Sequence, residues 1–99
     1  MNEWLPLPKF GDVLLELLEE RHIKQVDVAK AINVSKGNIS NVINNRRRLS
    51  LELSLLLGKA LGFSPNYFYN LQTTCEQRLL EREGKLQEKL AAVTMIDSW

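Results

Sequence analysis

Residues 25–44 restrict the fold of this chain more than any other region, because two short apolar patterns stand only three residues apart. Each pattern repeats apolar side chains every three or four positions, which is the spacing of a helix with one buried side. The apolar positions are Val28, Ala29 and Ile32 in the first pattern and Ile39, Val42 and Ile43 in the second. Asn33 tolerates the left-handed backbone of a tight turn, and Ser35 is a preferred N-cap for the next helix. Two short helices joined by such a turn predict a helix-turn-helix motif.

Positive charge is concentrated around this motif. The 99-residue chain has a net charge of only +1, yet residues 21–48 contain seven basic residues and one acidic residue. That window therefore carries +6, and the rest of the chain carries −5. The basic residues are Arg21, Lys24, Lys30, Lys36, Arg46, Arg47 and Arg48. A basic segment between acidic flanks predicts a polyanion on one face and a different partner on another.

The side of the second motif helix that faces away from its apolar residues is rich in hydrogen-bonding groups, which suit base edges in a major groove. Its residues are Lys36, Gly37, Asn38, Ser40, Asn41 and Asn44. Arg46, Arg47 and Arg48 follow directly, where a docked helix would meet phosphates. A run of arginines alone more often marks an ordinary solvated loop. Because turn, small-residue packing and charge coincide in one window, we predict that this surface binds double-stranded DNA.

Three further helices are predicted from apolar patterns with one buried side. Their inward positions are Phe10, Val13, Leu14, Leu17 and Leu18 in the first helix, Leu53, Leu56, Leu57, Ala60 and Leu61 in the fourth, and Phe68, Leu71, Cys75 and Leu79 in the fifth. Ser50 is expected to cap the fourth helix and Gly62 to end it. Ser64 followed by Pro65 predicts the start of the fifth. No strand-like alternation occurs, so the predicted fold is all-α.

The C-terminal quarter of the chain is charged and only weakly patterned. Leu79, Leu86 and Val93 are seven residues apart, as one apolar position of a heptad repeat would be. However, Gly84 interrupts the segment, and charged residues occupy the second heptad position that a coiled coil keeps apolar. We therefore expect a helical extension that frays or is ordered by a partner, rather than a long coiled coil. The predicted organisation is an N-terminal arm over residues 1–9, a helix-turn-helix domain over 10–75 and a charged extension over 76–99.

Several classes of protein are disfavoured by what the sequence lacks. It has no apolar run long enough to span a membrane and no secretory signal. One cysteine, Cys75, and one histidine, His22, provide neither a disulfide nor a zinc-ligand set. Paired carboxylates, a nucleophile with its base and a phosphate-binding loop are not recognisable. We expect a cytoplasmic protein without catalytic activity, metal or cofactor.

Two sequence blocks resemble the Xre-type helix-turn-helix superfamily, whose fold is that of the phage repressors. The block "VSKGNISNVINNRRRLS" and the block "LGKALGFSPNYFYNLQ" are most similar to HigA-type antitoxins of bacterial toxin–antitoxin operons. The similarity covers about Gly11 to Gln72. It implies a five-helix domain that represses its own operator, to which this chain adds a helical C-terminal extension.

The resemblance also implies roles for individual residues. Gln25 matches a glutamine that binds a phosphate and braces the recognition helix. Lys36, Asn38, Ser40 and Asn41 match positions that contact bases or nearby phosphates, and Arg46 and Arg47 match arginines that contact the DNA backbone. The chain departs from the pattern at Lys24, where a Ser or Thr cap is usual, at Asn33, which replaces a turn glycine, and at Gly37, which replaces a frequent base-reading side chain. The N-terminal "MNEWLPLPKF" also lacks the common entry to the first helix.

Two partners besides DNA are expected. Because one short helix-turn-helix buries too little surface to select an operator, we predict a homodimer. Its contact is placed on the fifth helix, at Tyr67, Phe68, Leu71 and Leu79. The resemblance implies a ribonuclease toxin as the second partner, and the acidic residues Glu16, Glu19 and Glu20 of the first helix offer a surface to a basic protein. The alternative is a stand-alone phage-type or chromosomal repressor, and a neighbouring toxin gene would separate the two.

Overall fold

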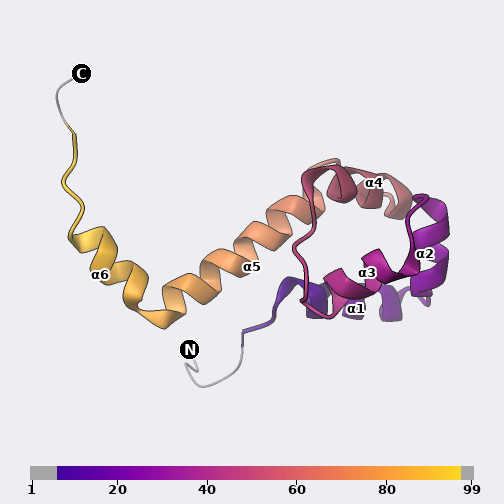
Figure 1. The fold of residues 1–99 in the computed structure, drawn as a ribbon, viewed down its shortest axis with the longest axis horizontal. Helices are drawn as coiled ribbons and strands as arrows, with labels where there is room; N and C mark the ends of the chain where they lie inside the picture. Colours follow the sequence, from indigo (N-terminus) through magenta and orange to yellow (C-terminus); the bar gives the residue numbers. More distant parts are fainter. Residues whose placement is uncertain (1–6, 97–99) are drawn as a thin grey trace.

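The computed structural model describes residues 7–96 as six helices, and this part of the chain contains no strand. The helices are α1 (Phe10–Glu20), α2 (Gln25–Ala31), α3 (Lys36–Ile43), α4 (Leu51–Leu61), α5 (Tyr67–Glu83) and α6 (Lys85–Ala91). The first four helices and the start of α5 form a domain, and the rest of α5 and α6 extend away from it (Figure 1). The all-α prediction is confirmed, and the predicted extension consists of the end of α5 together with α6.

Most helix ends follow the local signals in the sequence. The side-chain oxygens of Ser35 and Ser50 accept hydrogen bonds from the backbone N–H groups of Asn38 (3.3 Å) and Leu53 (3.1 Å), as N-caps do. Asn33 has a φ of 60°, so the expected left-handed turn between α2 and α3 is confirmed. At Lys24 the side chain makes no capping bond to α2, consistent with the missing Ser or Thr.

The end of α4 was predicted correctly, but the start of α5 was not. Gly62 ends α4 with a φ of 80°. The Ser64–Pro65 signal suggested that α5 begins at once, whereas α5 begins at Tyr67. The three preceding residues form a turn, in which the backbone N–H of Tyr67 donates to the carbonyl of Ser64 at 3.1 Å.

The core lies between α1, α2, α3, α4 and the first half of α5. Its buried apolar residues are Phe10, Leu14, Leu18, Val28, Ala29, Ile32, Ile39, Val42, Ile43, Leu49, Leu57, Phe68 and Cys75. Phe68 is fully buried, and its ring meets the rings of Phe10 and Phe63 edge to face, at centroid distances of 6.5 and 5.2 Å. The helix-turn-helix therefore rests on a continuous apolar base, which fixes the orientation of α3.

The predicted inward side of α4 is wrong at two positions. Leu57 is buried as expected, but Leu56 and Ala60 are exposed, while Ser54 and Gly58 are buried. The reason is close packing of the chain that follows α4, because a Cβ at Gly58 would lie 3.1 Å from the carbonyl oxygen of Ser64. Only a small residue fits there, so α4 turns its small side inward and leaves leucine exposed.

A buried glutamine joins α5 to the segment between α3 and α4. Gln72 is only 2 % exposed, and its side-chain oxygen accepts from the backbone N–H of Leu49 at 2.7 Å. Its side-chain nitrogen donates to the carbonyl of Leu49 at 3.0 Å. One side chain thus satisfies both backbone groups of a buried residue that belongs to no helix.

A second polar contact joins α1 to the end of α3. The backbone N–H of Gly11 donates to the side-chain oxygen of Asn45 at 2.9 Å, and the Asn45 side-chain nitrogen donates to Asp12 at 3.1 Å. Asn45 has a φ of 59°, which turns its side chain back toward α1. The polar segment that follows α3 is therefore anchored to the domain.

The extension is only partly a separate unit. The boundary that we predicted after residue 75 falls within α5, which continues without a break to Glu83. Gly84, with a φ of 83°, separates α5 from α6. Helix α6 contains no buried residue. Among residues 7–96, no helix is long and apolar enough to span a membrane.

Candidate nucleic-acid interface

The polar residues predicted on α3 share one side of that helix. Its opposite side buries Ile39, Val42 and Ile43 against the core. Lys36 and Asn44 are exposed, and Asn38, Ser40 and Asn41 are half-buried. In Figure 1, α3 lies in front of α1. We call the polar side of α3, formed by Lys36, Asn38, Ser40, Asn41 and Asn44, the α3 face.

Gln25 joins the α3 face at its N-terminal end. It is the first residue of α2, as Lys36 is the first residue of α3, and the two line one hollow of about 410 Å³. Lys24 and Glu19 line the same hollow. The structure therefore brings Gln25 beside the start of α3, where the resemblance implies that it acts.

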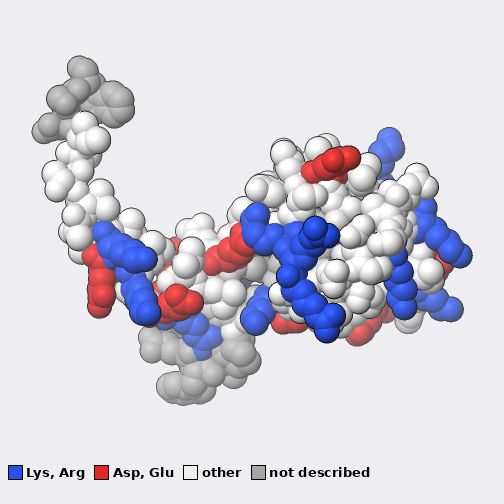
Figure 2. All heavy atoms as spheres, viewed as in Figure 1, with Lys and Arg blue, Asp and Glu red and all other residues white. Residues whose placement is uncertain are grey.

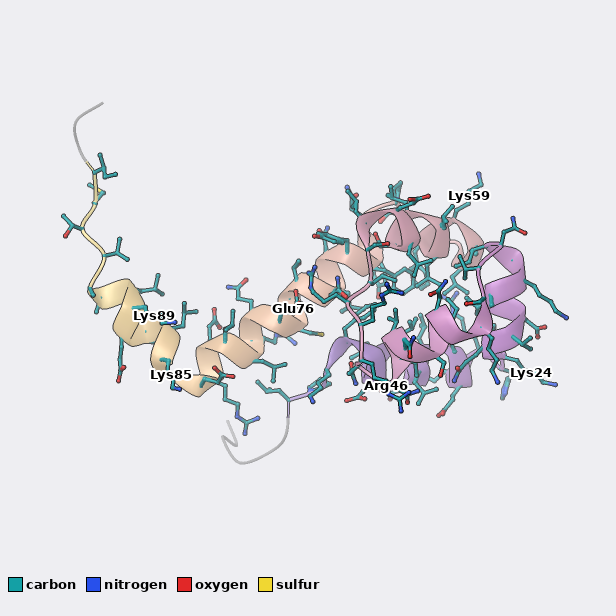
Figure 3. All side chains as sticks on the ribbon, viewed as in Figure 1. Lys24, Arg46, Lys59, Glu76, Lys85 and Lys89 are labelled. Carbon is teal, nitrogen blue, oxygen red and sulfur yellow. The ribbon has the colours of Figure 1, made fainter. Side chains whose placement is uncertain are left out.

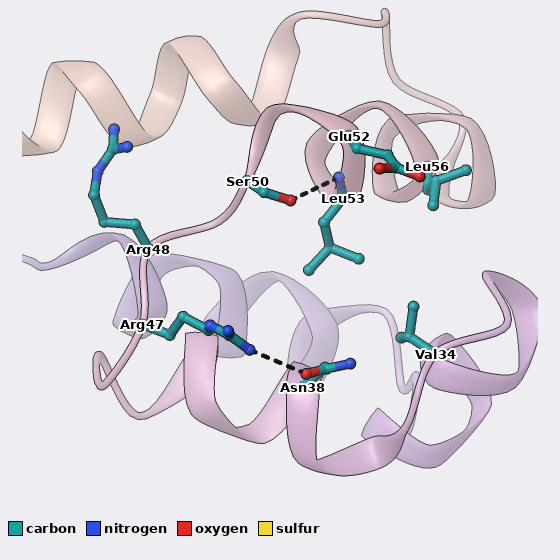
Figure 4. Close-up of a pocket in the computed structure, with 8 residues that line it drawn as sticks. All are labelled: Val34, Asn38, Arg47, Arg48, Ser50, Glu52, Leu53 and Leu56. Carbon is teal, nitrogen blue, oxygen red and sulfur yellow. Dashed lines mark hydrogen bonds between the residues drawn. The ribbon is translucent and has the colours of Figure 1, made fainter.

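Arg46 and Arg47 lie in the segment that follows α3, and only one of them bonds to that helix. The Arg47 guanidinium donates to the side-chain oxygen of Asn38 at 3.3 Å (Figure 4). Arg47 and Asn38 both line a groove of about 350 Å³ between α3 and α4. Within residues 7–96, the Arg46 side chain makes no hydrogen bond or ion pair, so it is free to meet a phosphate.

Arg48 is turned away from the α3 face. Its guanidinium forms a two-pronged ion pair with Glu76 of α5, at 2.5 and 2.8 Å. It also lies 5.8 Å from the ring centre of Tyr69. Hydrogen bonds from Arg48 hold the pKa of the Glu76 carboxyl below its usual range. The expectation that all three arginines act together therefore does not match the geometry, because Arg48 links the segment after α3 to α5.

The ion pair is expected to add little stability. Because its side chains are 54 % and 40 % exposed, Glu76→Gln should lower the free energy of unfolding by less than about 1 kcal/mol at neutral pH. The carboxyl pKa is lowered in the folded state, so this contribution is present above the ordinary glutamate pKa and lost as pH falls through the lowered value. Urea titrations should show a smaller difference at about pH 3 than at pH 7. Glu83→Gln is the matched control on α5, and an equal loss in both variants would contradict the expectation.

Basic and acidic side chains separate onto different sides of the domain. Figure 2 shows lysines and arginines gathered over α3, the segment after it and the adjoining edge near α2. The acidic residues of α1, Glu16, Glu19 and Glu20, are exposed as predicted. They belong to α1, which lies behind α3 in Figure 1. Figure 3 labels two of the basic residues, Lys24 and Arg46, on the part of the molecule that contains α2 and α3. The separation is incomplete at Glu19, which lines the same hollow as Gln25 and Lys36.

Arg21, one of the seven basic residues in the window 21–48, stabilises the packing of two helices and does not lie on the α3 face. The Arg21 guanidinium donates to the carbonyl of Leu61 at 3.0 Å and lies 4.6 Å from the ring centre of Phe63. It therefore ties the end of α1 to the end of α4. No signal in the sequence distinguishes Arg21 from the other basic residues, because its partners are 40 or more positions away.

The residues predicted for dimerisation differ in their exposure. Tyr67 is 39 % exposed and stacks on Phe63 at a centroid distance of 4.4 Å. Leu71 and Leu79 are half-buried. Phe68 is 0 % exposed, so its side chain belongs to the core and has no surface to offer a partner. The large apolar residues exposed on the extension are Leu80, Leu90, Val93, Met95 and Ile96.

The described residues contain no cluster of three or more side chains suited to hold a metal ion. Cys75 is buried, and burial raises the pKa of its thiol, which disfavours the reactive thiolate. This cysteine therefore packs in the core and is not a reactive group. The α3 face combines amides, a hydroxyl and cations, and these groups suit an anion with hydrogen-bonding edges.

Comparisons with known proteins agree with this geometry. Residues 14–68 match a family model described as helix-turn-helix. An uncharacterized helix-turn-helix transcriptional regulator of Haemophilus influenzae is 34 % identical over 84 residues, which are 84 % of this chain and 78 % of the relative. A candidate antidote protein of a plasmid maintenance system from Nostoc punctiforme has a similar structure, with a TM-score of 0.69 and 25 % identity over 92 % of this chain and 100 % of that one. The antitoxin HigA of Pseudomonas aeruginosa, solved with the higBA promoter, has the same fold, with a TM-score of 0.74 and 21 % identity over 92 % of this chain and all of that one.

Proposed function

This chain belongs to the Xre-type helix-turn-helix family of DNA-binding regulators, and from that premise we propose that it represses transcription by binding a specific operator through the α3 face. The observation that carries the proposal is the position of Arg46 and Arg47 directly after the polar side of α3, where Arg47 bonds to the Asn38 amide. Cations beside a helix that presents base-reading groups combine backbone affinity with sequence readout. The regulator would act on the bacterial chromosome in the cytoplasm.

Substitutions of Arg46 and Asn41 should distinguish the overall affinity for DNA from the preference for the operator sequence. Arg46→Ala should weaken binding to operator and random DNA alike, and it should lower the salt dependence by about one unit because one phosphate contact is lost. Asn41→Ala should cost about 1–3 kcal/mol on the operator and little on random DNA, because it removes a contact to a base edge. Fluorescence anisotropy with the DNA upstream of the gene, at several salt concentrations, measures both effects.

The exposed residue Lys59 on α4, outside the α3 face, provides a control for charge alone. Lys59→Ala should change binding to either DNA by less than Arg46→Ala does. An unchanged operator preference in Asn41→Ala would show that the reading face is assigned to the wrong residues.

We place the dimer contact on α5, around Tyr67, Leu71 and Leu79. The extension beyond it supports pairing of two copies, because residues 76–96 contain four acidic and four basic residues and so do not repel a second extension. Its exposed leucines would be covered by the partner. Sedimentation at tens of micromolar should show a dimer with and without operator DNA, and a monomer under both conditions would contradict this assignment.

The finer proposal is that the chain is an antitoxin, which neutralises a ribonuclease toxin and represses its own operon. The similarity to the Nostoc punctiforme protein and the two sequence blocks support it. So do Glu16, Glu19 and Glu20, whose exposed carboxylates suit a toxin made basic by its need to hold RNA. Binding of the toxin at α1 would leave Arg46 and Arg47 free for DNA, whereas Glu19 lies beside Gln25 and Lys36 at the other end of the α3 face.

Co-expression tests this part of the proposal. The chain should rescue cells from the toxin encoded beside it, and a variant with Arg46 and Arg47 replaced by alanine should rescue equally well. Rescue that depends on those arginines would mean that protection acts through DNA alone. The second candidate, a stand-alone repressor, is favoured by the Haemophilus influenzae relative, which is described only as a transcriptional regulator. The absence of a toxin gene beside this one would decide for it.

A further inference from the structure

The hydrogen bond between Arg47 and Asn38 has a consequence for how the α3 face would read DNA. Arg47 lies after α3, and Asn38 is the third residue of that helix. Residues near the N-terminus of a recognition helix are the ones that contact base edges. The guanidinium of Arg47 therefore bonds to a side chain at the reading end of the helix, not to one remote from it.

The chemistry of the two groups fixes the orientation of the Asn38 amide. An arginine side chain can only donate hydrogen bonds, so the atom that faces it must be the amide oxygen. Figure 4 shows this oxygen directed toward Arg47 and the amide nitrogen directed away from it. Asn38 consequently turns its two N–H donors away from Arg47, while Arg47 takes one of the two lone pairs of its oxygen.

The segment that carries Arg47 is held in place on both sides. Asn45 is bonded to Gly11 at 2.9 Å, and Arg48 is paired with Glu76. A guanidinium on an anchored segment loses little freedom when it holds Asn38, and the bond strengthens once DNA excludes water from it. The Arg46 side chain makes no hydrogen bond to α3, so we assign Arg46 and Arg47 different roles in DNA binding.

We infer that Arg47 is a positioning residue, which locks the Asn38 amide as a donor and so makes the protein prefer guanine to adenine at one base pair of each half-site. The inference rests on the proposed operator binding. In the major groove, guanine offers two acceptors, N7 and O6, whereas adenine offers the N7 acceptor beside the N6 donor. A locked donor matches guanine and meets the adenine N6 group with like polarity.

Asn41 provides an internal contrast. Within residues 7–96 its side chain makes no hydrogen bond, so its amide is free to rotate. A free asparagine can pair with adenine through both N6 and N7. The two asparagines of one helix are therefore assigned different bases, although their side chains are identical.

Selection from a randomised DNA library, followed by sequencing, tests the inference with four proteins. Wild-type chain and Asn38→Ala together identify the base pair that Asn38 reads, as the one whose preference the variant loses. At that base pair the wild-type chain should favour guanine over adenine. Arg47→Ala should reduce this preference about tenfold and accept adenine, because the freed amide can turn. Arg46→Ala, the matched control, should bind all sequences more weakly and keep the wild-type profile.

Each other outcome overturns the inference. Adenine at the Asn38 base pair in the wild-type chain, an Arg47→Ala profile equal to that of Arg46→Ala, or an Asn38→Ala profile equal to wild type would each remove it while leaving operator binding intact. If the wild-type chain enriches no sequence, the proposed function itself fails, and the inference fails with it. Both arginines are exposed, so equal thermal midpoints of the variants verify that folding is not the cause.

Discussion

Replacement of Gln72 by alanine is expected to lower the free energy of unfolding by about 3–5 kcal/mol, the largest effect that we predict for a single residue. The substitution removes both partners of the Leu49 backbone, whose N–H and carbonyl are bonded to Gln72 at 2.7 and 3.0 Å. Each buried group left without a hydrogen bond costs about 1–3 kcal/mol. The lost side-chain volume adds a cavity, because the Gln72 side chain is only 2 % exposed.

Chemical denaturation measures this effect, and α5 provides the control. Gln77 lies on the exposed side of the same helix, where its amide bonds only to Glu81. Gln77→Ala should therefore change the free energy of unfolding by no more than about 0.5 kcal/mol. Similar losses for the two variants would show that Gln72 is not the anchor of the segment before α4. Because that segment carries Arg46 and Arg47, we also expect Gln72→Ala to weaken DNA binding even where the protein remains folded.

Gly11→Ala is the second large effect, with an expected loss of about 3 kcal/mol. A Cβ at this position would lie 2.4 Å from the carbonyl oxygen of Ile43, 2.5 Å from that of Val42 and 2.6 Å from the side-chain oxygen of Asn45. The first two atoms are backbone, so α1 and α3 must separate to admit the methyl group. Overpacking of this kind costs about 1–3 kcal/mol, and the bond from the Gly11 N–H to Asn45 is lost in addition.

Gly37 is a matched control for Gly11. It lies on α3 with open space around it, since a Cβ there would meet only the Ser35 side-chain oxygen at 3.8 Å. Gly37→Ala should therefore stabilise the protein by about 0.5–1 kcal/mol, because alanine favours a helix. Thermal unfolding should move the midpoints of the two variants in opposite directions. A stabilising Gly11→Ala would contradict the close approach of α1 and α3.

Local patterns in the sequence were sufficient for most of the fold. Apolar spacing identified the helices, and Ser35, Ser50, Asn33 and Gly62 marked their ends, because each of these signals acts within a few residues. The prediction failed at α4, where the backbone of Ser64, six positions after Gly58, packs against the helix. Packing of the chain after α4 onto Gly58 turned that helix and exposed Leu56.

In the candidate site too, some features follow from the local sequence and others depend on contacts with distant residues. The polar side of α3 follows from helix geometry alone, once its apolar side is known. The tasks of Arg46, Arg47 and Arg48 do not, since three consecutive arginines are equivalent in the sequence. Their differences come from Asn38 and Glu76, which lie nine and 28 positions from their partners.

The sequence by itself therefore determined that this chain forms helices, where a helix-turn-helix lies and which side of α3 is polar. The tertiary structure alone decided which cations remain free, which glycine admits no side chain and which glutamine holds the segment after α3. The physical reason is range. Helix formation and capping depend on bonds between near neighbours, whereas Gly11, Gln72 and Arg48 act through contacts that exist only after distant parts of the chain have packed together.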